Sequence, residues 1–363
     1  MRRAVCLWIT AMLFFGSVGA VELPNISAVS AVLMDADSGR ILYGRMEDEP
    51  RLIASTTKLM TALVALESGH SPDEIVTIRA EWTGIEGSSL YLKAGETLRL
   101  ETLLYGMLLR SGNDAAHAVA GYCAGSVEDF VCRMNDKAKE LGMKNTHFSN
   151  PSGLNDEGHY STARDMAILA EACLKHEELR RIVGTRSVTL EGRILTNHNK
   201  LLWQYEGCIG MKTGYTRDAG RTLVSAAERD GMTLICVTLN APDDWRDHAA
   251  LFDYGFANYR LTKLVSRGEV VCRIPVSGSL IPFCEVYAQR ELWAALRDGE
   301  KAEREFQLDC EHLSAPVCLE SGVGQVKFSV QGELLGSSPL VTGKNIARDL
   351  APEKWNWKQL FGD

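Results

Sequence analysis

Ser55 and Lys58 are the residues whose types and spacing most directly suggest chemistry. They lie three residues apart at the start of an apolar segment, and on a helix this spacing stacks both side chains on one face. A serine hydroxyl is a weak nucleophile, so a hydrolase needs a partner that takes its proton during the attack, and an uncharged lysine amine can do this. The pair alone is not specific. Ser-x-x-Lys occurs about once or twice by chance in a chain of this length, and Ser55 could equally be an ordinary helix cap.

Two further motifs make the pattern specific. Ser111-Gly112-Asn113 follows a predicted helix, and Lys212-Thr213-Gly214 lies on a predicted strand. Their order and context fit the set Ser-x-x-Lys, Ser-x-Asn and Lys-Thr-Gly. Lys-Thr-Gly alone is expected on the order of once per several thousand residues, so the three motifs together predict one serine-based active site.

With these motifs the chain resembles the penicillin-recognising serine enzymes, and among them the low-molecular-mass penicillin-binding proteins that act as D-alanyl-D-alanine carboxypeptidases. The likeness covers roughly Leu33 to Phe256. It implies a hydrolase that removes the terminal D-alanine from peptidoglycan stem peptides through an acyl-enzyme on Ser55, and that β-lactam antibiotics inhibit covalently. Further segments carry the likeness: Gly87-Ser88-Ser89, Lys93-Ala94-Gly95-Glu96, Gly153-Leu154, Ser161 to Ala167, and Gly210-Met211 before Lys212.

Chemistry and the resemblance together suggest the catalytic roles. Ser55 should attack the carbonyl of the penultimate D-alanine. Lys58 is the candidate base, which requires that burial and the nearby charge of Lys212 lower its pKa far below the ordinary lysine value. Ser111 should pass a proton to the leaving amine.

The remaining site residues are expected to bind the substrate. Asn113 should hydrogen-bond the peptide backbone, with a helix cap as the alternative. Lys212 should stay charged and bind the substrate carboxylate together with Thr213, on the segment that includes Gly214. The backbone N–H groups of Ser55 and Tyr215 are the natural oxyanion donors.

An arginine is also expected as a further carboxylate anchor, because many members of the family that the chain resembles carry one after the last strand. Arg246 is the candidate, although Asp244 stands nearer the usual place. His147 is interpreted as structural, because no acidic residue is positioned beside it by spacing. We expect neither a metal nor a cofactor.

Three other functions compete with the carboxypeptidase interpretation. A serine β-lactamase needs a base that activates water, but the matching loop, Pro151 to Asn155, has proline at that place. A noncatalytic cell-wall binding module is disfavoured because Ser55, Lys58 and Lys212 are all present. A D,D-endopeptidase acting on crosslinked peptides would use the same residues and stays open.

The N-terminus and the charge indicate an exported protein. Residues 1–20 combine Arg2 and Arg3, an apolar run and a small-residue cleavage site, which is typical of a signal peptide. Without those arginines the chain holds 37 basic and 47 acidic residues, so nucleic acid and anionic lipid are not expected partners on electrostatic grounds. An exported location in the cell wall or periplasmic space follows.

The mature chain keeps nine cysteines and no Cys-x-x-Cys motif. An odd number cannot all pair within one chain, and the spacing offers no zinc or redox motif. Free thiols in an exported protein suggest, as a hypothesis, a host that lives without oxygen.

The elements that must position these residues alternate along the chain. A hairpin is expected around residues 29–43, helices near 55–68, 98–109, 114–123, 127–141 and 162–176, strands near 186–197, 209–213, 222–228 and 232–239, and a closing helix at 243–258. This order predicts an α+β fold of the β-lactamase/transpeptidase type, an antiparallel sheet with a helical cluster.

Four segments are expected in all. They are a signal peptide (1–20), a catalytic domain (21–262), a β-rich domain of short strands (263–345) and a tail (346–363). The tail holds Trp355, Trp357, Leu360 and Phe361, so a short interfacial helix touching the membrane is one interpretation, and a packed or frayed end is the other.

Overall fold

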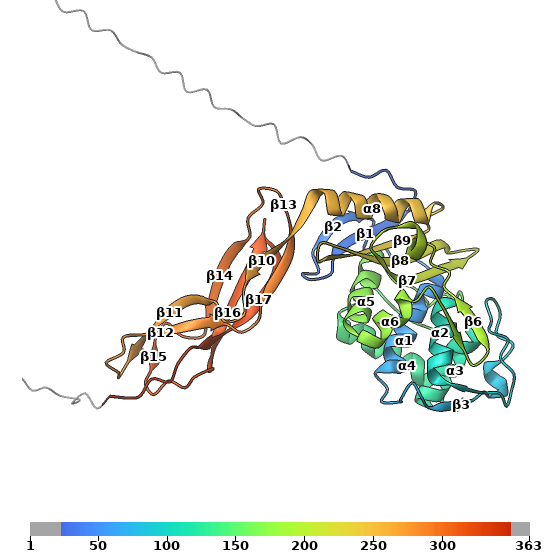
Figure 1. Ribbon diagram of the computed structural model, residues 1–363, viewed down its shortest axis with the longest axis horizontal. Helices are drawn as coiled ribbons and strands as arrows, with labels where there is room; N and C mark the ends of the chain where they lie inside the picture. The colour runs from blue at the N-terminus through green and yellow to red at the C-terminus, as the bar shows by residue number, and fades with distance from the viewer. Residues whose placement is uncertain (1–22, 350–363) are drawn as a thin grey trace, which may run out of the picture.

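The computed structural model describes residues 23–349. The expected signal peptide, residues 1–20, lies outside this range, and so do residues 350–363 of the expected tail. Two units follow one another along the long axis of the molecule (Figure 1). The first carries helices and a sheet, and the second is built of strands only.

The first unit is organised by a five-stranded antiparallel sheet that joins distant parts of the chain. The N-terminal hairpin pairs with the late strands in the register Ser30 to Leu239. The predicted α+β fold, in which sheet halves far apart in sequence meet, is therefore confirmed. The strand order is β2 (Ile41–Arg45), β1 (Ser30–Asp35), β9 (Met232–Leu239), β8 (Gly220–Arg229), β7 (Cys208–Thr216).

The two faces of this sheet are covered by different helices. Side chains alternate along a strand, so Val32 and Met34 of β1 enter the core of the helical cluster, whereas Ala31 and Leu33 pack toward the closing helix. Figure 1 shows that helix, α8 (Asp244–Asn258), lying alone across one face. The cluster on the other face contains α1 (Lys58–Leu66), α2 (Leu100–Leu109), α3 (Asn113–Ala124), α4 (Val127–Leu141), α5 (Ala163–Lys175) and α6 (Glu177–Gly184).

Local sequence signals set several helix ends. Ser126 caps α4 by accepting a hydrogen bond from the backbone of Asp129, and Gly142 ends the helix in the left-handed conformation. Thr162 caps α5 in the same way through Asp165. The remaining elements of this unit are small: β3 (Ile75–Thr77), β4 (Thr97–Arg99), β5 (Ser187–Leu190), β6 (Arg193–Thr196) and α7 (Leu201–Gln204).

The second unit confirms the predicted β domain but begins differently. Strand β10 (Tyr259–Val265) runs across the boundary expected at residue 262 and pairs with β13 (Leu292–Arg297). The segment from Val317 to Leu319, inside the region where short strands were expected, contributes only an isolated bridge between Val317 and Ile346. The main sheet has the order β14 (Glu303–Leu308), β16 (Gly322–Val330), β17 (Glu333–Thr342), β12 (Phe283–Ala288), β11 (Val270–Ser277), β15 (Leu313–Ser314).

Polar contacts of the N-terminal hairpin tie the two units together. Arg40 pairs with Glu300 at 2.7 Å, and both side chains are largely buried. The carboxylate of Asp35 accepts a hydrogen bond from the backbone of Ala295 at 2.9 Å. Because buried charges are found paired, these contacts indicate a defined junction between the units.

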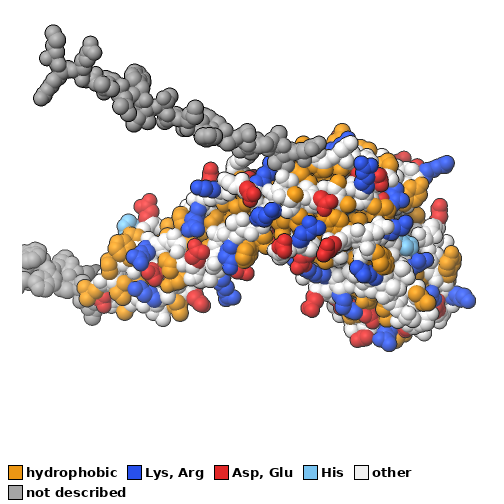
Figure 2. All heavy atoms as spheres, turned by 45° about the horizontal axis from the view of Figure 1, so that its top comes forward, with side chains coloured by type: hydrophobic (Ala, Val, Ile, Leu, Met, Phe, Trp, Pro, Cys, Tyr) orange, Lys and Arg blue, Asp and Glu red, His pale blue; other side chains and the backbone are white. Residues whose placement is uncertain are grey.

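Positive and negative side chains are intermixed over the face shown in Figure 2, without a basic area that would suit nucleic acid. Among residues 23–349 the nine cysteines are free thiols. No helix in this range is both long and apolar enough to cross a bilayer.

Candidate active site

The nucleophile lies in a tight turn at the start of α1. Ser55 belongs to the 3-10 turn Ala54–Thr57, which leads directly into α1 at Lys58. In a 3-10 turn the side chains at i and i+3 eclipse, so the Ser-x-x-Lys spacing works here through a tighter geometry than the expected α-helix. The amine Nζ of Lys58 lies 2.8 Å from Oγ of Ser55.

The Lys58 amine is oriented by two carbonyl oxygens. It lies 2.7 Å from Oδ1 of Asn113 and 2.6 Å from the backbone oxygen of Ser152, and the whole side chain is buried. Carbonyl oxygens only accept hydrogen bonds, so the two hydrogens of a neutral amine go to them and its lone pair faces the Ser55 hydroxyl.

The electrostatic environment favours that neutral form. Burial lowers the pKa of Lys58 well below the ordinary lysine value, and the charge of Lys212 lowers it further, while Asp114 opposes both effects. The arrangement can therefore deprotonate Ser55 as it attacks a carbonyl.

The second motif reaches the site through a strained backbone. Ser111 has φ of 63°, a left-handed conformation that costs of order 1–3 kcal/mol in a residue other than glycine. Asn113 opens α3, and its Nδ2 donates to the backbone oxygen of Glu86 at 2.6 Å. The Asn113 side chain thus joins the Lys58 amine to the loop that lines the opposite wall.

Lys212 comes to the site as a buried amine. Its Nζ donates to Oγ of Ser111 at 3.2 Å and to the backbone oxygen of Thr213 at 2.9 Å, and the side chain is buried. Burial lowers its pKa to about 7, so near neutral pH it is charged only part of the time. The expectation that Lys212 is charged and binds the substrate carboxylate stays a prediction; the structure places its amine between Ser111 and the backbone oxygen of Thr213.

Gly214 lets β7 pass directly beside the nucleophile. A Cβ at this position would lie 2.3 Å from Oγ1 of Thr222 and 3.1 Å from the backbone nitrogen of Ser55. Tyr215 follows with an exposed side chain, on the outer strand of the sheet. The two backbone N–H groups expected to bind an oxyanion are therefore on adjacent segments.

The loop from Ser149 to Ser161 holds the nucleophile turn from behind. A Cβ on Gly153 would lie 1.9 Å from the backbone oxygen of Ala54, so only glycine fits there. The same oxygen accepts a hydrogen bond from Oγ1 of Thr57 at 2.8 Å, and Thr57 contacts Nε2 of His159 at 2.7 Å. One loop therefore fixes the backbone before Ser55 and, through Ser152, the amine of Lys58.

His159 takes part in this contact as a neutral ring. Its Nδ1 accepts from the backbone of Ser149 at 3.1 Å, so its proton is on Nε2 and is donated to Thr57. Burial lowers the pKa of His159 to about 4, against the charge of Asp156. His147, interpreted from sequence as structural, contacts the backbone oxygen of Gly158 in the same loop.

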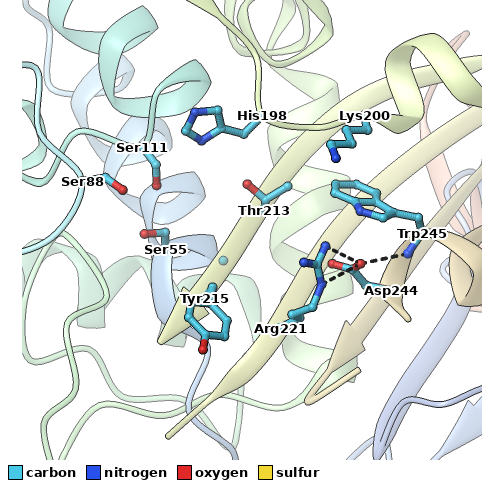
Figure 3. A pocket seen from close by; sticks show the side chains of 11 residues that line it. Ser55, Ser88, Ser111, His198, Lys200, Thr213, Tyr215, Arg221, Asp244 and Trp245 are labelled. Carbon is cyan, nitrogen blue, oxygen red and sulfur yellow. Dashed lines mark hydrogen bonds and ion pairs between the residues drawn. The ribbon is translucent and has the colours of Figure 1, made fainter. Parts of the chain in front are cut away.

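A pocket of about 310 Å³ opens on one side of Ser55. Ser111, Thr213 and Gly214 line it near the nucleophile, and Arg221, Asp244 and Trp245 line its far end (Figure 3). Arg221 donates through Nε and Nη2 to Oδ1 of Asp244, at 3.0 and 2.7 Å. Its guanidinium also lies 5.5 Å from the Trp245 ring, which makes Arg221 an oriented cation in this pocket.

Arg246 is not part of the site, which corrects the expectation from the sequence. Its side chain is 77% exposed, and its nearest carboxylate is that of Asp243 at 3.9 Å. The reason is helical periodicity: Asp244, Asp247 and His248 form the buried face of α8, and Arg246 points away from it. Asp244 occupies the place expected for a cation, and Arg221 of β8 supplies the positive charge.

The structure therefore brings together Ser55, Lys58, Ser111, Asn113, Lys212, Thr213, Gly214 and Tyr215, and leaves Arg246 out. Sequence reasoning missed Ser152, His159, Arg221 and Asp114. Asp114 is buried and accepts hydrogen bonds from the backbone of Leu90 and Leu92, which anchors the loop around Ser88. Only Asp114 had a sequence signal, because it directly follows the Ser-x-Asn motif, whereas the other three depend on contacts between distant segments.

The chain is similar to known proteins both in sequence and in overall structure. Residues 17–243 match the D-alanyl-D-alanine carboxypeptidase family. The chain is 34% identical to D-alanyl-D-alanine carboxypeptidase DacF of Bacillus subtilis over 88% of this chain and 86% of that protein. It is 34% identical to DacD of Escherichia coli over 89% and 88%. The solved structure of penicillin binding protein 5 from Haemophilus influenzae superposes with a TM-score of 0.79 at 31% identity, covering 90% of this chain and 99% of that one.

Proposed function

The chain belongs to the D-alanyl-D-alanine carboxypeptidase family, and on that premise we propose that it removes the terminal D-alanine from peptidoglycan stem peptides through an acyl-enzyme on Ser55. The observation that carries the proposal is the Lys58 amine, which lies 2.8 Å from Ser55 Oγ while two carbonyl oxygens accept its hydrogens. β-Lactam antibiotics are the corresponding covalent inhibitors.

In this mechanism Lys58 takes the proton of Ser55 as the hydroxyl attacks the carbonyl of the penultimate D-alanine. The backbone N–H groups of Ser55 and Tyr215 stabilise the oxyanion. Ser111 passes the proton that Lys58 has taken to the leaving amine as the C–N bond breaks, and the terminal D-alanine departs. Water then attacks the ester carbonyl while neutral Lys58 takes its proton, and this proton returns to Ser55 Oγ as the ester bond breaks.

The substrate carboxylate binds in the pocket that holds Thr213 and Arg221. Among the cations that line this pocket, Arg221 is oriented by the buried carboxylate of Asp244 and by the ring of Trp245. Its guanidinium offers several hydrogen-bond donors in one plane, which suits a carboxylate. Asn113 contributes to the site by holding Lys58 and the Glu86 backbone.

The β-lactamase alternative is disfavoured by the loop behind the nucleophile. Pro151 has no side chain that can accept a proton, and its backbone oxygen accepts a hydrogen bond from Thr61. An acyl-enzyme formed with penicillin is therefore expected to be long-lived. Endopeptidase action on crosslinked peptides would use the same groups and is a second activity to assay.

Export to the cell wall or periplasmic space, through the signal peptide at 1–20, is part of the proposal. Membrane contact through residues 346–363 is also part of the proposal. In the second unit, Asp349 is held by Ser279 and by the backbone of Leu280, whose side chain is 84% exposed. The residues that follow include two tryptophans. Binding of the full chain to lipid vesicles, compared with a chain ending at Asp349, tests this contact.

Mass spectrometry after incubation with penicillin tests the proposed function most directly. One adduct on the peptide that contains Ser55, and release of D-alanine from a peptide ending in D-Ala-D-Ala, are expected. Ser55→Ala should abolish both. Labelling that persists in this variant would remove Ser55 from its role.

A further inference from the structure

One buried carboxylate ties the segment that precedes β1 to the first turn of α8. Asp247 is 2% exposed, and its carboxylate accepts three hydrogen bonds from this segment. The backbone N–H and the hydroxyl of Ser27 donate at 2.8 and 2.7 Å, and the backbone N–H of Ala28 donates at 2.9 Å. Because a buried charge is costly unless it is hydrogen-bonded, these contacts fix the segment and the helix to each other.

The same serine hydroxyl also binds the residue at which α8 begins. Asp243 directly precedes the first helical residue, and its own side chain forms no capping hydrogen bond. Its backbone N–H donates to Oγ of Ser27 at 3.0 Å. In a capping box this N–H is bound by a side chain of the helix itself, whereas here the acceptor lies 216 positions earlier in the chain. Ser27 therefore holds the start of α8 from outside the helix.

The segment around Ser27 is itself held firmly in place. Ile26 and Ala28 on either side of it are buried in the apolar cluster that also contains the buried face of α8. The backbone N–H of Val29 donates to the backbone oxygen of Asn240 at 3.1 Å. Packing and backbone pairing therefore set the position of the Ser27 hydroxyl, although the residue itself is exposed.

The first turn of α8 carries the group that orients the cation of the carboxylate pocket. Asp244 directly follows Asp243, and its Oδ1 accepts both hydrogen bonds from the Arg221 guanidinium (Figure 3). The backbone of Arg221 is bound to the same stretch, because the N–H of Ala241 donates to its carbonyl oxygen at 2.9 Å. A shift at the start of α8 would therefore move Asp244 and, with it, the guanidinium.

We infer that Ser27 is a positioning residue for recognition of the substrate carboxylate. Its hydroxyl fixes the first turn of α8 through Asp243 and Asp247, and this turn fixes Asp244 against Arg221. Ser27 does not line the pocket beside the nucleophile, so it acts only through these other residues. The inference rests on the proposed function, since it concerns the carboxylate pocket of the same site.

The test measures kcat/KM for release of the C-terminal group from two peptides. One peptide ends in D-Ala-D-Ala with a free carboxylate, and the other is the same peptide with a C-terminal carboxamide. Ser27→Ala removes the hydroxyl and changes no charge. It should lower kcat/KM for the free-carboxylate peptide about three- to five-fold, because a small misplacement of a binding group is costly, and leave the carboxamide peptide near its wild-type value. Ser27→Thr keeps a hydroxyl and should stay within about twofold of wild type for both peptides.

Two comparisons separate positioning from a general loss of stability. Tyr205→Phe removes a different hydroxyl that donates to a carboxylate of α8, that of Asp253, at 2.8 Å. Asp253 lies about 14 Å further along the helix than Asp244, so this control should keep the wild-type ratio between the two peptides. In an Arg221→Gln background, Ser27→Ala should lower kcat/KM less than about 1.5-fold, because the guanidinium to be positioned is absent.

Three results overturn the inference while leaving the proposed function intact. The first is a Ser27→Ala variant that keeps the wild-type ratio between the peptides. The second is an equal loss for both peptides, and the third is a loss in the Arg221→Gln background as large as the loss in wild type. Failure of the proposed function looks different: neither peptide would be cleaved by the wild-type enzyme, and Ser55 would not be labelled by penicillin.

Discussion

Arg221→Gln should weaken the enzyme specifically toward substrates that have a free carboxylate. In the resting enzyme, Nε and one hydrogen of Nη2 bind Asp244, which leaves Nη1 and the other hydrogen of Nη2 for a ligand. A hydrogen bond between charged groups contributes about 1.5–3 kcal/mol. The Arg221 side chain is 41% exposed, so solvent screening favours the lower part of this range. A loss of about 1.5–2 kcal/mol corresponds to a roughly 10- to 30-fold fall in kcat/KM.

The single substitution also leaves Asp244 without its partner. Asp244 is buried, and burial already raises its pKa, so its remaining charge would repel the substrate carboxylate. The double variant Arg221→Gln/Asp244→Asn removes this repulsion and isolates the missing cation. We expect it to recover part of the loss but to remain about 10-fold below wild type.

The assay measures D-alanine release from a peptide with a free C-terminal carboxylate, and release of alanine amide from the same peptide with a C-terminal carboxamide. Arg221→Gln should lower kcat/KM for the first peptide and leave the second near its wild-type value. Arg246→Gln should change neither. An equal loss for both peptides, or no loss in Arg221→Gln, would refute the assignment of the carboxylate to Arg221.

Three further predictions follow from the buried polar groups and the thiols. Lys212→Met removes a nearby positive charge that lowers the pKa of Lys58. Because Lys58 then stays protonated to higher pH, the acid limb of the pH profile for penicillin acylation should move up by at least about half a pH unit. An acid limb at the wild-type pH would mean that Lys212 does not lower the pKa of Lys58. His159→Phe should slow acylation about 10- to 100-fold at an unchanged Kd for penicillin, because small misplacement of a nucleophile is costly. The control variant Thr61→Val removes a different hydrogen bond to the same loop and should slow acylation less than about threefold. If His159→Phe and Thr61→Val slow acylation equally at matched thermal stability, His159 has only a structural role. Thiol titration of the denatured mature protein under non-reducing conditions should detect more than one free thiol, and detection of a single thiol would reject the hypothesis of an oxygen-free habitat.

The direction in which activity changes with pH on the acid side also follows from the pKa of Lys58. A lysine whose pKa is lowered by burial is neutral above that pKa and charged below it. Acylation should therefore rise with pH through the pKa of Lys58, which lies well below the ordinary lysine value.

The sequence by itself determined the chemistry and the order of the elements. Ser55, Lys58, Ser111 and Lys212 are recognisable because their motifs are short and local. The neighbouring helices α4 and α5 carry local signals of their own, the caps Ser126 and Thr162. The α+β fold was predictable for the same reason, since each hairpin and helix has its own local signal.

Only the tertiary structure decided which distant groups complete the site. Arg221, Ser152 and His159 come from a strand and a loop whose positions depend on sheet pairing and on close packing at Gly153. Arg246 was wrongly assigned because it lies two residues after Asp244, and two residues along a helix turn a side chain by about 200°, which moves it from the cleft to solvent. Side-chain direction and burial are properties of the packed chain, so the pKa of Lys212 and the exchange of Arg246 for Arg221 could not be read from spacing alone.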